Sequence, residues 1–357
     1  MTLRAQLDAL PIPILQAPMV GASSFEMALA VSKAGGMGHL AGGAMAPEAI
    51  ESAVAAMRAR TDAPFGVNLL MAPRAQPDAA EVDRALARLA PWYAELGELL
   101  PAHPNEFAPD FESQLAAVVR AAPPVVSFTF GILTADQIDA LHDAGTQVVG
   151  TATSVAEARA WAEVGADGIC AQGFEAGGHR GHFLAEIEAS LVGTMALTTL
   201  IGAAVDLPVI AAGGIMDGRG VAAALALGAS AVQMGTAFLL ADQASVSAPW
   251  RRSIQSVGDE PTRLTRAFTG RFARGIDNRF MRDLRAVETE VPAYPVQNRL
   301  TQALRAAASK ADNPDMVSLW AGQGVGLARP GEAGDMIQAW WREAQEASAA
   351  LQARVSR

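Results

Sequence analysis

The sequence has almost no cysteine, few charged residues and no long apolar run. Cys170 is the only cysteine in 357 residues, so an intrachain disulfide is excluded and the cytoplasm is the expected location. Its apolar surroundings predict a buried, unreactive thiol. Charged residues make up 18% and the formal net charge is -10. Nucleic acid is therefore not an expected partner, because phosphate binding requires clustered Lys and Arg.

Neither a membrane span nor a secretory signal is indicated. Apolar runs such as 207–215 are too short, and too broken by glycine, to cross a bilayer. Residues 1–8 lack the charged and apolar regions of a signal peptide. We expect a soluble protein without membrane partners, present as a monomer or a homodimer.

The apolar content of 51% is typical of an α/β protein whose parallel sheet is covered on both faces. Short apolar segments alternate with helical patterns, and three helices end in glycine immediately before such a segment. This alternation predicts a (β/α)8 barrel. Strands are expected at 12–19, 37–41, 65–70, 125–130, 147–152, 168–172, 208–213 and 231–235, and helices at 24–34, 47–60, 79–99, 111–121, 134–144, 190–205 and 218–227.

The composition changes after about residue 245. The segment 250–285 is rich in Arg and Asp, prolines interrupt the chain near 292–295, and helices are expected at 300–311 and 333–355. We predict that residues 1–245 form the barrel, that 246–315 form a mostly helical lobe covering the substrate at its mouth, and that 316–357 pack back on the barrel. The segment 72–124 is interpreted as an elaborated crossover.

The polar loop 171–183 follows the sixth predicted strand and interrupts an otherwise apolar chain. Its adjacent glycines, Gly177 and Gly178, allow the backbone to approach a flat ligand closely. Barrel enzymes keep their chemistry at the carboxyl ends of the strands, so His179 is predicted to transfer protons near neutral pH. The alternative is a glycine-rich loop with a solvated histidine.

Two further glycine loops follow the seventh and eighth strands, at 212–220 and 233–236. Their N–H groups and the N-terminus of the next helix are predicted to hold a phosphate. We expect Ala17-Pro18-Met19 to lie beside a flat ring, and Asn68 and Gln172 to bond its polar edge. FMN fits this set better than a sugar phosphate, because these strand ends carry few Lys or carboxylate groups.

Several of these segments together resemble class I nitronate monooxygenase, formerly called 2-nitropropane dioxygenase. They are Gln16-Ala-Pro-Met19, Gly66-Val-Asn68, Ala171-Gln-Gly-Phe-Glu-Ala-Gly-Gly-His-Arg-Gly181, Ala212-Gly-Gly-Ile215, Gln233-Met-Gly-Thr236 and Leu319-Trp-Ala-Gly-Gln-Gly-Val-Gly-Leu327. The resemblance runs from about residue 11 to residue 329. It implies that the barrel of residues 1–245 binds FMN tightly and that His179 is the active-site histidine.

The resemblance also implies the reaction: oxidation of alkyl nitronates, such as propionate 3-nitronate, by O2 to a carbonyl compound and nitrite, without a metal or a nicotinamide. The partners are thus small molecules. The FMN contacts it implies, with Gly213 added from the glycine loop, are Ala17, Pro18, Met19, Asn68, Gln172, Gly177, Gly178, Gly213, Gly214, Gln233, Met234, Gly235 and Thr236.

A nitronate is already an anion, so the enzyme needs a positively polarised pocket beside the flavin. We expect His179 to hydrogen-bond the nitronate oxygens, or to act as a base when a neutral nitroalkane enters. Tyr294 and Lys310, in the covering lobe, are predicted substrate contacts. Arg180 either adds positive potential or pairs with a carboxylate such as Glu175.

The sequence leaves three alternatives open. His39 either borders the pocket or is a hydrogen-bonded structural residue. FMN-dependent NAD(P)H reductases, of the enoyl-ACP or quinone type, resemble the chain in the same glycine and histidine loops. A non-catalytic FMN- or phosphate-binding barrel is the third possibility.

Overall fold

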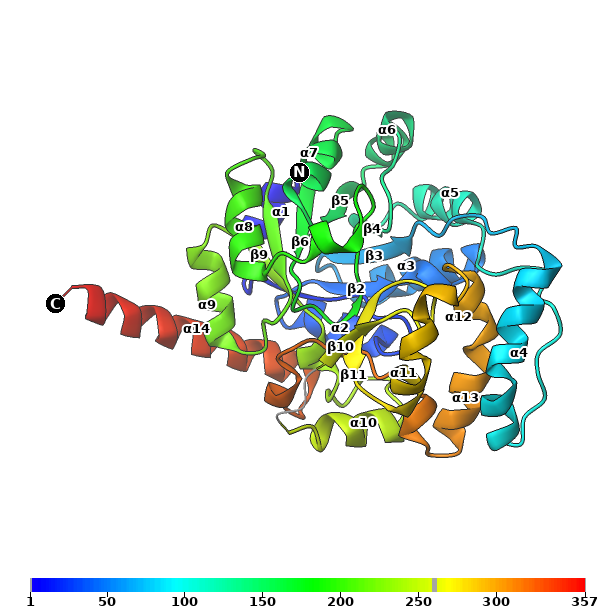
Figure 1. The fold of residues 1–357 in the computed structure, drawn as a ribbon. Coiled ribbons are helices and arrows are strands. Elements are labelled where there is room, and N and C mark those ends of the chain that lie inside the picture. Colours follow the sequence, from blue (N-terminus) through cyan, green and yellow to red (C-terminus); the bar gives the residue numbers. More distant parts are fainter. Residues whose placement is uncertain (1, 259–261, 357) are drawn as a thin grey trace.

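The computed structural model describes residues 2–258 and 262–356, and its centre is a parallel eight-stranded sheet (Figure 1). The strand order is β1-β9-β8-β6-β5-β4-β3-β2, and a parallel bridge between Leu15 and Met37 brings its two ends together. The predicted barrel is therefore confirmed. Its strands are β1 (Ile14–Gln16), β2 (Gly38–Ala41), β3 (Phe65–Leu70), β4 (Val125–Thr129), β5 (Gln147–Ala152), β6 (Gly168–Gln172), β8 (Val209–Ala212) and β9 (Ala231–Met234).

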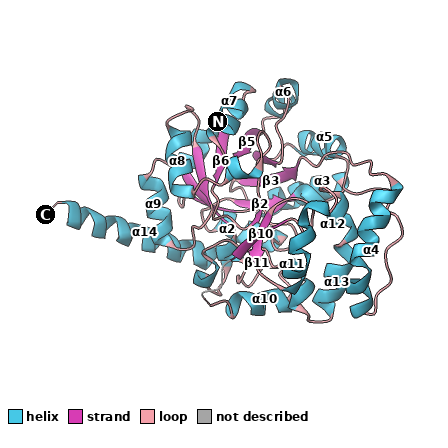
Figure 2. Cartoon of the chain, viewed as in Figure 1, coloured by secondary structure: helices cyan, strands magenta, loops and turns pink. Residues whose placement is uncertain are grey.

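Helices between successive strands form the outer layer (Figure 2). Their first turns begin where the sequence provides caps: the side chains of Ser24, Thr134 and Ser154 each accept a hydrogen bond from a backbone N–H three residues later. Pro47 occupies the first turn of its helix, where its missing N–H has no cost. These helices are α2 (Phe25–Lys33), α3 (Pro47–Arg60), α5 (Phe111–Ala121), α6 (Ala135–Asp143), α7 (Val155–Glu163), α8 (Thr194–Gly202) and α9 (Gly218–Ala226).

The helix that completes this layer comes from the end of the chain. Helix α14 (Ala333–Val355) packs against both α9 and α2, and so occupies the position in the outer layer between these two helices. Its Trp340 is buried and meets Phe238 edge-to-face, with ring centroids 5.0 Å apart. The last turns of α14 extend away from the body (Figure 1). Of the helices in the described part of the chain, none has the length and apolar character needed to span a membrane.

A short N-terminal helix, α1 (Leu3–Asp8), closes the amino end of the barrel. Leu3 and Leu7 are buried and belong to one cluster with barrel residues such as Val125 and Ile210. The barrel interior is thus filled with side chains at this end. Ligand binding is left to the opposite end, where the strands finish.

The lobe over that opposite end is built from two separate stretches of sequence. Helix α4, from the long segment between β3 and β4, lies beside α12 and shares a buried cluster with the late segment (Figure 1). The Tyr93 hydroxyl donates to the Leu300 carbonyl oxygen at 2.7 Å. The segment interpreted as a crossover therefore supplies part of the lobe. The lobe helices are α4 (Ala79–Glu95), α10 (Ala248–Gln255), α11 (Arg279–Leu284), α12 (Val296–Leu300) and α13 (Gln302–Lys310).

A small antiparallel sheet joins the lobe to the barrel. Its order is β10-β11-β7, with β10 (Thr262–Thr265), β11 (Ala273–Ile276) and β7 (Gly178–His179). His179 pairs with Ala273 across this sheet. The short 3-10 helices are Gly42–Ala44, Ile187–Ser190, Thr236–Phe238, Arg285–Glu290, Pro314–Met316 and Val325–Leu327.

Three predicted helices have different limits in the structure. Helix α4 ends at Glu95, because Gly97 adopts a positive φ of 68°. The helix expected at 190–205 starts only at Thr194. The helix expected at 300–311 is divided at Thr301, whose hydroxyl donates to the Phe268 carbonyl oxygen at 2.5 Å.

Candidate active site

A cavity of about 840 Å³ lies between the carboxyl ends of the barrel strands and the lobe. This volume is within the roughly 300–1,000 Å³ usual for small-molecule sites. Residues from distant parts of the sequence meet there. The predicted residues that line it are Ala17, Pro18, Met19, Asn68, Gln172, Gly177, Gly178, His179, Gly213, Gly214, Gln233, Gly235, Thr236 and Tyr294.

Two predicted site residues do not line the cavity. The Met234 side chain belongs to a buried cluster with Ile14 and Phe238, because successive side chains of a strand face opposite ways and Gln233 takes the cavity side. Lys310 is exposed at the last position of α13. It is therefore not retained as a substrate contact.

The loops after β6, β8 and β9 bring glycine backbone to one side of the cavity. Gly213 and Gly214 adopt positive φ values of 120° and 70°, which side chains disfavour. A Cβ on Gly177 would lie 2.5 Å from the backbone nitrogen of Gly322. Among the described residues, no acceptor bonds the backbone N–H groups of Gly214 and Gly235. Glycine therefore allows the close packing and the positive φ angles of these loops, which offer free N–H groups beside the cavity.

The N-terminus of α9, predicted to hold a phosphate, is capped by the protein itself. Asp217 accepts a hydrogen bond from the Gly220 N–H at 3.1 Å, and Glu343 accepts one from the Gly218 N–H at 3.0 Å. These carboxylates already occupy the positive end of the helix dipole. This part of the phosphate prediction is wrong, and the free N–H groups lie in the glycine turns.

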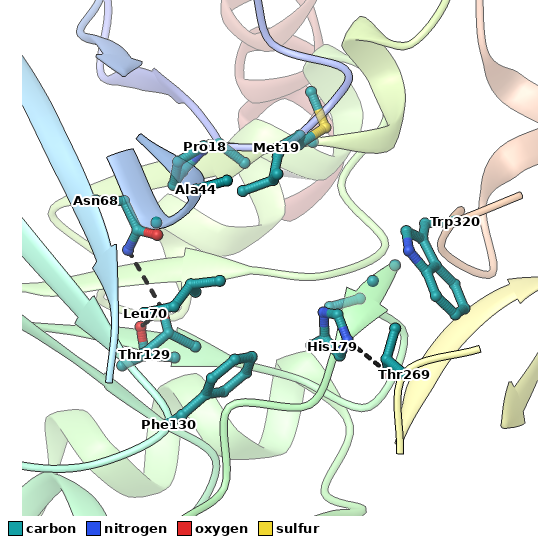
Figure 3. A pocket seen from close by; sticks show the side chains of 18 of the residues that line it. Pro18, Met19, Ala44, Asn68, Leu70, Thr129, Phe130, His179, Thr269 and Trp320 are labelled. Carbon is teal, nitrogen blue, oxygen red and sulfur yellow. Dashed lines mark hydrogen bonds between the residues drawn. The ribbon is translucent and has the colours of Figure 1, made fainter. Parts of the chain in front are cut away.

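The ring of His179 faces the cavity, and Figure 3 shows it between the aromatic side chains of Phe130 and Trp320. Tyr294 is a third aromatic neighbour. The centroid of the imidazole lies 5.5 Å from that of Phe130, 5.8 Å from Tyr294 and 5.7 Å from Trp320. The Nε2 atom is 2.9 Å from the Thr269 hydroxyl oxygen. The imidazole is thus held on one edge and open to the cavity on the other.

The surroundings of His179 keep its imidazole neutral. Burial, together with the positive charges of Arg271 and Arg305, lowers its pKa to about 3. Near pH 7 the ring therefore has one N–H and one basic nitrogen. The neutral ring adds no positive charge to the cavity, so we look for that charge in another group.

Arg305 supplies such a charge. It lines the cavity, and its guanidinium donates to the backbone and side-chain oxygens of Asn298 at 2.9 and 2.8 Å. Its Nε is buried without an acceptor, and no carboxylate of the described residues forms a salt bridge with it. Burial lowers its pKa to about 10, which still leaves it cationic near neutrality.

The loop that carries His179 is fixed from within by Arg180. This side chain is fully buried and donates to the carbonyl oxygens of Gln172, Gly173 and Ser190 at 2.6 to 3.0 Å. Arg180 also donates to the Gln172 side-chain oxygen, and Gln172 Nε2 donates to the His179 carbonyl oxygen. Both side chains therefore order the loop. Within the described chain Arg180 has no carboxylate partner at salt-bridge distance.

Two other polar residues have structural roles. The Glu175 carboxylate accepts bonds from the Thr194 N–H at 2.8 Å and hydroxyl at 2.7 Å, so it orients the loop against the start of α8. His39 is 2% exposed and does not line the cavity, and burial lowers its pKa to about 4. Cys170 does border the cavity, but burial raises the pKa of its thiol to about 12.

Sequence reasoning missed Phe130, Thr269, Asn298 and Arg305 as cavity residues, although one signal was present. Positions 298, 302 and 305 repeat with helical spacing and all line the cavity. Phe130, by contrast, has an unusual positive φ of 86° that no sequence pattern reveals.

The chain is similar to several known proteins over most of its length. A family model described as nitronate monooxygenase matches residues 3–343. A nitronate monooxygenase of Pseudomonas aeruginosa is 42% identical over 91% of this chain and 94% of its own. The crystal structure of a nitroalkane oxidase from Streptomyces ansochromogenes is 41% identical, with a TM-score of 0.89 over 97% of this chain and 99% of its own. FabK from Thermotoga maritima is 30% identical, with a TM-score of 0.75 over 99% of both chains.

Proposed function

The chain belongs to the nitronate monooxygenase family of flavin-dependent oxidoreductases and oxidises nitronates, and we propose that it does so with FMN and O2, releasing a carbonyl compound and nitrite. The observation that carries the proposal is one cavity with a glycine cradle on its barrel side, and with a neutral His179 and an Arg305 that has no carboxylate partner among the described residues on its lobe side.

The barrel side fits FMN in shape and chemistry. The free N–H groups of Gly214 and Gly235 suit a phosphate, which accepts several hydrogen bonds. Pro18 and Met19 give an apolar surface for a flat ring. The Asn68 amide nitrogen donates to Ser127, leaving its oxygen for the polar edge of the ring. When bound, FMN would accept electrons from the substrate and return them to O2.

The lobe side fits a small anionic substrate. Arg305 is a partly buried cation in this wall that forms no salt bridge with a carboxylate of the described residues. The carboxylates among the lining residues, Glu106 and Asp110, are exposed at the rim. We propose that the guanidinium of Arg305 attracts and orients the nitronate anion, since a cation acts more strongly where water is excluded.

His179 then serves neutral substrates. A nitroalkane must lose a carbon-bound proton before it is oxidised, and a neutral imidazole near the flavin can accept that proton. The low pKa of His179 leaves the imidazole unprotonated near pH 7, which the role of a base requires. The charge left on the substrate would face Arg305.

The test is to purify the protein, determine whether it holds non-covalent FMN, and measure nitrite release from propionate 3-nitronate and ethyl nitronate in air. The expected result is nitrite from both, without added NADPH. NADPH oxidation without nitrite release would instead favour the reductase alternative. Bound flavin with neither activity would favour a non-catalytic barrel.

A further inference from the structure

The contact between His179 and Thr269 determines which nitrogen of the imidazole has the proton. A threonine hydroxyl has one hydrogen to donate and two lone pairs to accept with. The Thr269 hydroxyl lies 3.0 Å from the Arg271 carbonyl oxygen, and a carbonyl oxygen can only accept. With the hydroxyl hydrogen directed at Arg271, both contacts are hydrogen bonds; directed at His179, it would leave the Arg271 carbonyl oxygen without this donor.

In the arrangement that satisfies both contacts, the remaining contacts of the hydroxyl are acceptor contacts. The Arg271 backbone N–H donates to the Thr269 oxygen at 3.4 Å, and the other lone pair faces His179 Nε2 at 2.9 Å. Nε2 must supply the hydrogen in this bond. In a neutral imidazole with Nε2 protonated, Nδ1 is the basic nitrogen.

The backbone around Thr269 is also held in place. The Arg271 guanidinium donates to the Arg180 carbonyl oxygen at 3.1 Å and also to that of His182, and it lies over the Phe130 ring at 4.2 Å. These contacts restrain Arg271, whose carbonyl oxygen accepts from the Thr269 hydroxyl. Figure 3 shows the other ring nitrogen of His179 on the side away from Thr269.

We propose that Thr269 is a positioning residue that holds His179 as the Nε2–H tautomer, so that Nδ1 faces the cavity as the base for neutral nitroalkanes. The inference rests on the proposed function only for the identity of the substrate. A nitronate needs no base, so the loss of Thr269 should separate the two substrate classes.

The direct test is nitrogen-15 NMR of the FMN-loaded protein labelled at histidine. The chain has five histidines, and the spectrum of His179→Asn identifies the His179 signals. The expected result is a protonated Nε2 and an unprotonated Nδ1. Protonated Nδ1 with bare Nε2, or protonation of both at pH 7, would overturn the proposal.

Kinetics with matched variants give the second test. Thr269→Val keeps the shape and removes the hydroxyl, whereas Thr269→Ser keeps the hydroxyl. We expect kcat/KM for nitroethane to fall about tenfold in the valine variant and that for ethyl nitronate to change less than twofold, with serine close to the wild type. A folded, flavin-loaded valine variant with unchanged nitroethane activity would contradict the proposal.

The NMR result does not depend on turnover. A wild-type protein that shows the Nε2–H tautomer but oxidises neither substrate would disprove the proposed function and leave the role of Thr269 intact. If the valine variant does not fold, the proposal is still tested by the tautomer of His179 in the wild type and by the activity of the serine variant.

Discussion

The two sides of the cavity are made of different chemical groups. The barrel side presents backbone and small residues, such as Gly177, Gly214 and Gly235, which offer N–H groups and close approach. The lobe side presents side chains, with Arg305 as a cation and Trp320 as an aromatic surface beside His179. Backbone N–H groups are suited to hold the cofactor, whereas the side chains of the lobe are suited to select the substrate.

If the two sides have separate tasks, changes on the lobe side should alter turnover without loss of flavin. The largest effect is expected for His179→Asn, which removes the basic nitrogen. We expect kcat/KM for nitroethane to fall by about a hundredfold or more, the usual contribution of a general base, and that for ethyl nitronate to fall much less. Steady-state nitrite release measures both. Equal, full activity on both substrates would remove His179 from the mechanism.

Changes on the barrel side should affect flavin binding first. Gly177→Ala places a Cβ 2.5 Å from the Gly322 nitrogen. The loop that carries Gly177 must then shift from its place beside the cavity. We therefore expect FMN affinity to weaken about thirtyfold, corresponding to ~2 kcal/mol of overpacking. Fluorescence titration of the apoprotein with FMN measures this. Gly202→Ala is the control, because no atom lies within 4 Å of its added Cβ. Tight FMN binding by the Gly177 variant would contradict the assignment of this side.

Arg305→Met tests the lobe side through charge, with most of the apolar stem kept. We expect KM for ethyl nitronate to rise about tenfold, since a bond to a charged group contributes ~1.5–3 kcal/mol, and FMN content to stay constant. Arg299→Met is the matched variant: Arg299 also lines the cavity but is exposed to solvent, where charges are screened. Equal effects of the two changes would show that burial of Arg305 does not matter.

The smallest effect concerns stability away from the cavity. The pKa of His39 is lowered to about 4 from 6.5, so the unfolded chain takes up a proton that the folded chain does not as the pH falls. Stability should therefore fall by about 1 kcal/mol from pH 7 to pH 5.5 through this residue. Urea unfolding of His39→Gln should show a correspondingly weaker pH dependence. An unchanged pH dependence of stability in this variant would refute the lowered pKa of His39.

The barrel side was more predictable from sequence than the lobe side, for a physical reason. Glycine turns, strand ends and helix caps depend on residues close together in sequence, so Asn68, Gly214 and Thr236 were placed correctly in the cavity. The contact between His179 and Thr269 joins residues 90 positions apart, and β7 exists only because β11 pairs with it. No local pattern reports such pairings.

Local patterns also failed where a side chain had more than one possible partner. The loop 212–220 predicts a phosphate site because it leads into a helix N-terminus, yet Glu343, from the far end of the chain, caps that helix. The position of Lys310 in the covering lobe predicts a substrate contact, but the helix turns this residue to solvent and brings Arg305 to the cavity. In both cases the tertiary arrangement decides which of two similar groups faces the ligand.

The most direct test of the account is to mix the FMN-loaded protein anaerobically with ethyl nitronate and, separately, with NADPH, and to follow the flavin absorbance. The account predicts rapid loss of the oxidised flavin spectrum with the nitronate and a slow or absent change with NADPH. Rapid bleaching by NADPH, with no response to the nitronate, would contradict it.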